Sequence, residues 1–204
     1  MHELAIKITD YLIARGVSKK SERDFYIYGC EILLLKIANV GTLLCIALVM
    51  GNLVEGIILL LTFMTLRKYT GGFHLGSALS CYIFTALVYM SSLYLCVNYM
   101  GSEAMCLVIV IISEIIIVSL APIDNPNLNL TEEEIMSMKK QIKRLVVLLS
   151  VILILLMLWG KGIRFISPIV VGIVLDAMFI VVAKIHKKRG ERSAEGKRKR
   201  LGIN

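Results

Sequence analysis

Six long apolar runs, separated by short polar gaps, limit what this chain can fold into more than any other feature. A helix needs about 20 apolar residues to cross the hydrocarbon core of a bilayer, and only helices or closed barrels satisfy their backbone hydrogen bonds there. The sequence therefore predicts an all-α, polytopic membrane protein with about six transmembrane helices. The runs are 32–50, 53–66, 79–97, 104–121, 145–159 and 165–183. The second run has fourteen residues, so whether it spans the bilayer fully is left open.

The composition also favours the lipid bilayer as the surroundings of this chain. Of the 204 residues 57% are hydrophobic, and the mean hydropathy is +0.79, whereas soluble domains have about 45–50% apolar residues. The net charge of +8 does not indicate nucleic-acid binding, because Lys and Arg lie in the gaps between the runs and at the chain ends. The cysteines lack CxxC or metal-ligand spacing, so we expect no disulfide framework, zinc site or other cofactor. They are Cys30, Cys45, Cys81, Cys96 and Cys106.

Residues 1–30 are an amphipathic segment that precedes the first apolar run. Charged residues are interleaved with Leu, Ile and Tyr, and no apolar core of a cleavable signal peptide is visible. Gly16 is expected to end a first helix, and Ser18 or Ser21 to start a second short helix through Tyr28. Two interpretations remain open, because such helices lie either in the headgroup plane or against the membrane domain itself.

Alternate gaps differ sharply in positive charge. Lys and Arg are concentrated in the N-terminal segment, in the gaps 67–78 and 122–144, and in the tail, where there are nine from Lys184 onward. The gaps on the opposite side contain none, or two at 160–164. The positive-inside rule therefore predicts that both termini and the 67–78 gap are cytoplasmic.

The chain is expected to form one membrane domain over 1–204. Its parts are the amphipathic segment 1–30, a transmembrane helical core 31–183 and a basic cytoplasmic tail 184–204. For the tail we expect a disordered segment held against anionic lipid, with recognition of an acidic partner segment as the second interpretation.

The segment 67–81 contains a histidine and a cysteine, the two side chains that catalysis by a thiol nucleophile needs. A histidine can take the proton of a cysteine near neutral pH, and the thiolate is the reactive form. His74 and Cys81 on one unbroken helix would be about 10.5 Å apart along the axis, too far for a general base. If they act together, residues 71–77 cannot be plain helix, and Gly71, Gly72 and Gly76 supply the break. Ser77 or Ser80 would then cap a new helix with Cys81 in its first turn, where the helix dipole stabilises a thiolate.

Other polar residues of the apolar runs leave alternatives open. Asn39, Glu55, Glu114 and Asp176 either pair internally or supply a third catalytic group that orients His74. Cys45, Cys96 and Cys106 are expected to be packing residues. After the fourth run, two prolines forbid helix in 121–127, and Thr131 with Glu134 predicts the capped start of the next helix.

The pattern Gly71-Gly72-x-His74, followed by six residues and Cys81 with Arg67 upstream, resembles the accessory gene regulator B family of bacterial quorum-sensing membrane peptidases. The amphipathic N-terminus, the six apolar runs and the Ala121-Pro122-x-Asp124-x-Pro126 loop extend this resemblance over most of the chain. It implies a cysteine endopeptidase of the bacterial cell membrane, with His74 and Cys81 as catalytic residues at the cytoplasmic side. The family cuts a small amphipathic pro-peptide, whose own cysteine or serine then displaces the enzyme to form a thiolactone or lactone.

The weaker assignments concern binding. Backbone N–H groups near Gly71 and Gly72, or at the start of the new helix, are candidates for holding the oxyanion. Arg67 and Lys68 either bind an acidic part of the pro-peptide or anchor the chain as ordinary inside charges. The partners expected are the pro-peptide and the lipid bilayer, without nucleic acid; a homodimer is left open. Competing functions are a membrane peptidase that simply hydrolyses its substrate and a transporter or scaffold without peptidase activity.

Overall fold

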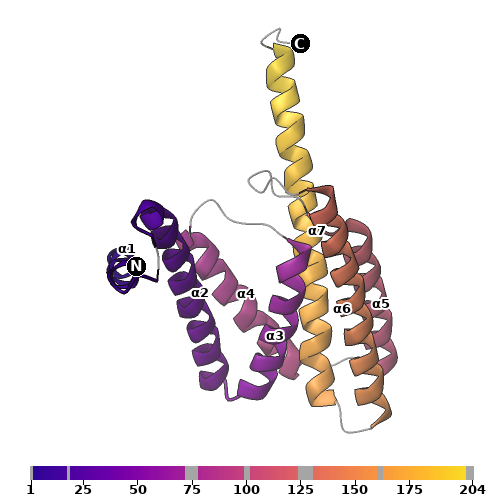
Figure 1. Ribbon diagram of the computed structural model, residues 1–204. Coiled ribbons are helices and arrows are strands. Elements are labelled where there is room, and N and C mark those ends of the chain that lie inside the picture. The colour runs from indigo at the N-terminus through magenta and orange to yellow at the C-terminus, as the bar shows by residue number, and fades with distance from the viewer. Residues whose placement is uncertain are drawn as a thin grey trace.

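The computed structural model describes residues 2–17, 19–71, 78–98, 102–123, 131–159 and 163–200. Within these ranges the chain is helical throughout its regular structure, as the apolar runs predict (Figure 1). The helices are α1 (His2–Ala14), a short 3-10 helix (Lys20–Glu22), α2 (Arg23–Val49), α3 (Leu53–Thr70), α4 (Ala78–Asn98), α5 (Glu103–Leu120), α6 (Glu132–Leu158) and α7 (Ile163–Arg200).

Helices α2 to α7 run alternately up and down in Figure 1, so that α1 and the end of α7 lie at the same end of the molecule. Five of them are long and apolar enough to cross a membrane, namely α2, α4, α5, α6 and α7. The exception among the six is α3, because its 18 residues include Glu55, Arg67 and Lys68. It nevertheless packs along α7 and between α2 and α6.

The core is organised around α7, which contacts α3, α4, α5 and α6. Fully buried residues such as Leu66, Ile117, Ile142 and Ile173 form one apolar cluster on this helix. A second cluster, around Leu59 and Leu93, joins α2, α3 and α4. Large apolar side chains also cover the outside of the bundle, which is expected where the surrounding solvent is lipid.

Helices α3 and α7 run in the same direction and touch along their length (Figure 1). Near their first turns, the side chain of Arg164 donates to the buried carboxylate of Glu55. Midway, a Cβ added at Gly172 would lie 2.9 Å from Cγ2 of Thr62. Near the end of α3, the hydroxyl of Thr70 donates a hydrogen bond to the carboxylate of Asp176 in α7. Three separate contacts therefore fix the register of this helix pair.

The N-terminal segment differs in part from its prediction. Gly16, at φ 71°, ends α1 as expected. The second short helix is wrong as a separate element, since the chain passes from the 3-10 helix into a continuous α2 of 27 residues. Ser21 lies inside the 3-10 helix and is not its cap, and Ser18 lies outside the described residues.

Helix α1 packs on the first half of α2, as one of the two interpretations expects. Arg23 donates to both carboxylate oxygens of Asp10 at 2.7 and 3.0 Å, and His2 Nδ1 lies 2.7 Å from Glu31 Oε1. The Arg23 guanidinium holds the pKa of Asp10 below its usual range, mainly through this hydrogen bond. Polar contacts therefore join the ends of α1 to α2.

Helices α2, α3, α6 and α7 extend further than their apolar runs, and α6 and α7 do so most. Helix α6 starts at Glu132, with the predicted Thr131 and Glu134 capping box in place, and so includes the basic segment before the run 145–159. Helix α7 continues to Arg200, which makes the prediction of a disordered tail wrong. Glu, Lys, Arg and Ala are good helix formers in water, so a helix can continue past the point where its apolar residues end.

Candidate active site

The end of α3 is shaped by Gly71, whose backbone angles are φ 73° and ψ −165°. This region of backbone space is open essentially to glycine alone, so the predicted break after the helix is confirmed at this residue. A Cβ at Gly71 would lie 2.6 Å from the carbonyl oxygen of Ile123, whose N–H donates to the carbonyl of Thr70 at 2.9 Å. The first residues after α5 are therefore docked on the end of α3.

Cys81 is the fourth residue of α4 (Ala78–Asn98), as predicted, and its side chain is half-buried. The first turn of a helix has N–H groups without intrahelical partners, and the positive end of the dipole favours a thiolate there. Ser80 lies within α4, so the prediction that it caps this helix is wrong, and Ser77 lies outside the described residues.

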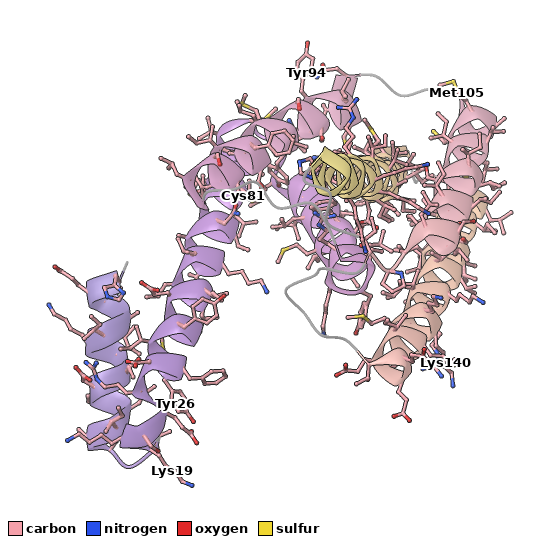
Figure 2. All side chains as sticks on the ribbon, turned by 90° about the horizontal axis from the view of Figure 1, so that it is seen from above. Lys19, Tyr26, Cys81, Tyr94, Met105 and Lys140 are labelled. Carbon is pink, nitrogen blue, oxygen red and sulfur yellow. The ribbon has the colours of Figure 1, made fainter. Side chains whose placement is uncertain are left out.

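A cavity of about 260 Å³ opens beside Cys81, between α2, α3, α4 and α7. Figure 2 looks down on this end of the molecule and shows Cys81 between α2 and the α3–α7 pair. Arg67 lines the same cavity, so the structure brings these two predicted site residues together. Lys36 and Asn39 also line it, and most of the remaining wall is apolar or aromatic, including Phe63, Phe84, Tyr89 and Phe179.

The guanidinium of Arg67 is held from α7. Its Cζ lies 5.0 Å from the centre of the Phe179 ring, a cation–π contact. Its charge also acts on Cys81 and on Asp176. The carboxylate of Asp176 is completely buried and accepts a hydrogen bond of 3.0 Å from Thr70 Oγ1. Charge, ring and thiol thus meet at one end of the α3–α7 pair.

The other polar residues of the apolar runs have different surroundings. Glu55 pairs with Arg164 at the far end of α3, and Glu114 accepts a hydrogen bond of 2.6 Å from Ser150 between α5 and α6. Asn39 lines the cavity with its Oδ1 buried and unbonded within the described part of the chain. Of the three acids among these candidates, Asp176 is therefore the one whose charge interacts with Arg67, which lines the cavity together with Cys81.

Several predicted residues are placed elsewhere or lie outside the described ranges. His74 and Gly72 belong to 72–77, which the structure does not describe, as do Asp124 and Pro126 to 124–130. Lys68 is exposed and is not part of the cavity wall. Cys96 and Cys106 are buried packing residues as predicted, whereas Cys45 is exposed, contrary to its prediction. Among the described residues, no group of three or more His, Cys, Asp or Glu could hold a metal ion.

Sequence reasoning missed Thr70, Phe179 and Ile123 as parts of this site. The spacing of Asp176 and Phe179 was a usable signal, since residues three apart share one face of a helix. The hydrogen bond from Thr70 to Asp176 joins residues 106 apart, and no local pattern in the sequence reports such a contact.

Comparison with known proteins identifies relatives of this chain. The model of the family described as accessory gene regulator B matches residues 5–182. An AgrB-like protein of Listeria monocytogenes serovar 1/2a is 29% identical over 89 residues, which is 43% of this chain and 44% of that relative. An AgrB-like protein of serotype 4a of the same species is 28% identical over a match of the same length. The match thus spans less than half of these relatives.

No solved structure matches this chain significantly. The family match, in contrast, covers most of the sequence, from the first turn of α1 to near the end of the buried part of α7. It includes Arg67, Gly71 and Cys81, whose surroundings are described above, as well as His74. The chain belongs to the accessory gene regulator B family.

Proposed function

We propose that this protein is a membrane-embedded cysteine endopeptidase that cleaves a small amphipathic pro-peptide and promotes its cyclisation to a signal peptide. Membership of the accessory gene regulator B family supports a role in agr quorum sensing. The observation that carries the peptidase proposal is the position of Cys81, in the first turn of α4 and in one cavity with Arg67. A lone structural cysteine has no need of a cation beside it.

In the proposed reaction His74 takes the proton of the Cys81 thiol, and the thiolate attacks a carbonyl carbon of the pro-peptide. Backbone N–H groups at Gly71, Gly72 or the start of α4 hold the oxyanion that forms. The C–N bond then breaks, the leaving amine takes the proton from His74, and the C-terminal fragment departs. The N-terminal part stays bound to Cys81 as a thioester.

Cyclisation completes the cycle without water. A cysteine or serine side chain of the bound peptide attacks the thioester carbonyl, the new S–C or O–C bond closes the ring, and Cys81 leaves with the proton. The cavity beside Cys81 is mostly apolar, and a site from which water is excluded favours transfer to a peptide nucleophile over hydrolysis. Arg67 is suited to bind an acidic group of the substrate beside the scissile bond.

Mass spectrometry of the purified protein in detergent, mixed with candidate pro-peptide, tests this mechanism. Wild type is expected to carry a peptide adduct on Cys81, Cys81→Ala to carry none, and His74→Ala to form the adduct slowly. Cys45→Ala is the matched control, because Cys45 is an exposed cysteine outside the cavity wall. A released product lighter by one water than the hydrolysed fragment identifies the ring.

Three other results would redirect the proposal. A linear product from a Cys81 adduct would mean a hydrolysing peptidase. Normal cleavage by both Cys81→Ala and His74→Ala would rule out the thiol mechanism, and the absence of any cleavage by wild type would favour a transporter or scaffold.

A further inference from the structure

We propose that Asp176 is a positioning residue that holds the guanidinium of Arg67 in the cavity beside the Cys81 thiol. The proposal rests on the proposed function in one respect, that Cys81 is the nucleophile. It assigns to α7, almost a hundred positions from the motif in the sequence, a direct part in arranging the site.

The first argument is burial. Asp176 has no exposed surface, and only one of its two carboxylate oxygens is hydrogen-bonded, by Thr70. The other, Oδ2, accepts no hydrogen bond from any residue that the structure describes. A buried carboxylate is costly unless it is paired. Arg67 is a cation whose charge acts on this carboxylate. An attraction that positions the Arg67 guanidinium would explain why an acid is buried at this point.

The second argument is geometry. Asp176 and Phe179 lie on one face of α7, and Arg67 and Thr70 lie on one face of α3. Thr70 fixes the carboxylate, while the Phe179 ring supports the guanidinium at 5.0 Å from its centre. The ring thus contacts the guanidinium, and the hydroxyl orients a carboxylate whose charge acts on it. Arg67 and Phe179 both line the cavity that contains Cys81. The position of the guanidinium therefore affects the electrostatic potential at the thiol.

The third argument is the sign of the charges. If Asp176 only neutralised Arg67, it would weaken the positive potential at Cys81, and its removal would strengthen that potential. If Asp176 holds Arg67 in place, its removal lets the guanidinium leave the cavity, and the positive potential at Cys81 falls. The two roles therefore predict opposite changes for the same substitution.

Alkylation of Cys81 by two reagents of similar size measures this potential without any peptide substrate. Iodoacetate is an anion and iodoacetamide is neutral. The rate constant for iodoacetate divided by that for iodoacetamide therefore rises with positive potential at the thiol. Mass spectrometry of the fragment that contains Cys81 gives both rate constants in the full-length protein. Because the ratio cancels changes in general accessibility, a merely structural role of Asp176 would not move it.

We expect Arg67→Gln to lower this ratio on the order of fivefold, the effect of a unit charge at contact distance even in water. Asp176→Asn is expected to lower it in the same direction, and Thr70→Val partly, because the valine cannot donate to the carboxylate. Thr70→Ser keeps the hydroxyl and should restore the wild-type ratio. Glu114→Gln, which removes a different buried acid between α5 and α6, is the control and should leave the ratio unchanged.

A ratio that rises or stays constant in Asp176→Asn, while it falls in Arg67→Gln, would overturn the proposal. Peptide cleavage by the same variants is a separate readout. Misplacement of a catalytic environment by about 1 Å can cost on the order of a hundredfold in rate, so Asp176→Asn should slow formation of the Cys81 adduct by tenfold to a hundredfold. If wild type forms no adduct but the alkylation ratios behave as expected, the proposed peptidase function fails and the positioning role stands.

Discussion

Gly71 is the residue on which two parts of the site depend. Its backbone angles exclude other residues, and a side chain there would meet the carbonyl of Ile123. Gly16 has nearly the same φ of 71°, but a Cβ at Gly16 would meet nothing within 4 Å. Alanine at Gly16 therefore meets backbone strain without a clash, whereas alanine at Gly71 meets both.

Gly71→Ala is expected to lower the free energy of unfolding by more than about 3 kcal/mol, the upper end for a strained backbone alone, since the clash adds to it. Gly16→Ala should cost only about 1–2 kcal/mol. Thermal unfolding in detergent measures both, and Cys81 adduct formation should fall only in Gly71→Ala. Equal losses of stability in the two variants would show that Ile123 moves aside without cost.

The ion pair of Glu55 and Arg164 is asymmetric, and its two halves should respond differently to substitution. The Glu55 side chain is 6% exposed and that of Arg164 is 65% exposed. Removal of a partner from a buried charge costs about 3–5 kcal/mol, so Arg164→Gln should be strongly destabilising. Glu55→Gln leaves an arginine that reaches water, and should cost much less.

The double variant Glu55→Gln, Arg164→Gln should recover most of the stability lost in Arg164→Gln, again by thermal unfolding in detergent. A loss of stability in Glu55→Gln as large as that in Arg164→Gln would contradict the asymmetry. It would mean that an unpaired Arg164 also destabilises the fold.

How far individual site residues could be predicted from the sequence follows from the range of their contacts. Cys81 in a first helical turn and the break at Gly71 are local, so spacing and glycine chemistry predicted both. Asp176 stood among four polar candidates without a preference, because the register of α3 against α7 decides which acid meets Arg67. That register depends on packing between residues about 110 positions apart, such as Thr62 and Gly172, and no periodicity encodes it.

Helix packing gives the next prediction, at the close contact of α3 with α7. A Cβ at Gly172 would lie 2.9 Å from Cγ2 and 3.0 Å from Cβ of Thr62, while a Cβ at Gly41 in α2 would meet nothing within 4 Å. Both glycines lie inside helices, so alanine gains about 1 kcal/mol of helix propensity at either position. Overpacking of a close contact costs roughly 1–3 kcal/mol.

Gly172→Ala is therefore expected to unfold at lower temperature than Gly41→Ala, with a difference of about 2 kcal/mol in the free energy of unfolding. Thr62→Ser removes the methyl group that the new Cβ would strike, and should restore stability when it is combined with Gly172→Ala. If the double variant is no more stable than Gly172→Ala alone, the contact that limits the approach of the two helices lies elsewhere.

The helix ends show what apolar runs can and cannot predict. Helices α4 and α5 agree with their runs to within a residue or two at each end, because polar gaps and a turn follow directly. For α2, α6 and α7 the runs mark only the apolar part of the helix, and each helix continues into a segment that includes charged residues. Apolar runs thus predict which part of a helix is expected in the membrane, whereas capping residues such as Thr131 predict where a helix begins.

At the scale of the whole molecule, the prediction concerns the side of the membrane on which each end of the bundle lies. We propose that both termini are cytoplasmic, from the distribution of Lys and Arg, and that α3 crosses the bilayer despite its three charges. In a chain with its five cysteines replaced by alanine, Ser102→Cys and Trp159→Cys should react with a membrane-impermeant maleimide in intact cells. Lys20→Cys and Lys188→Cys should react only after permeabilisation.

Each alternative gives a distinct labelling pattern. An inverted protein would exchange the two classes of cysteine. Opposite behaviour of Lys20→Cys and Lys188→Cys would mean an odd number of crossings, and so an α3 that does not span. These four sites are exposed at the two ends of the bundle, so a lack of reaction reports the membrane and not burial.

The helical extension of α7 sets how far its end can reach beyond the bundle. The 17 residues from Lys184 to Arg200 continue as helix past the bundle (Figure 1), which corresponds to roughly 25 Å at 1.5 Å per residue. The potential of an anionic lipid surface decays within about 8 Å at physiological salt. A helix of this length along the bilayer normal would end about three screening lengths from the lipid surface, so an anionic surface would attract its last turns only weakly.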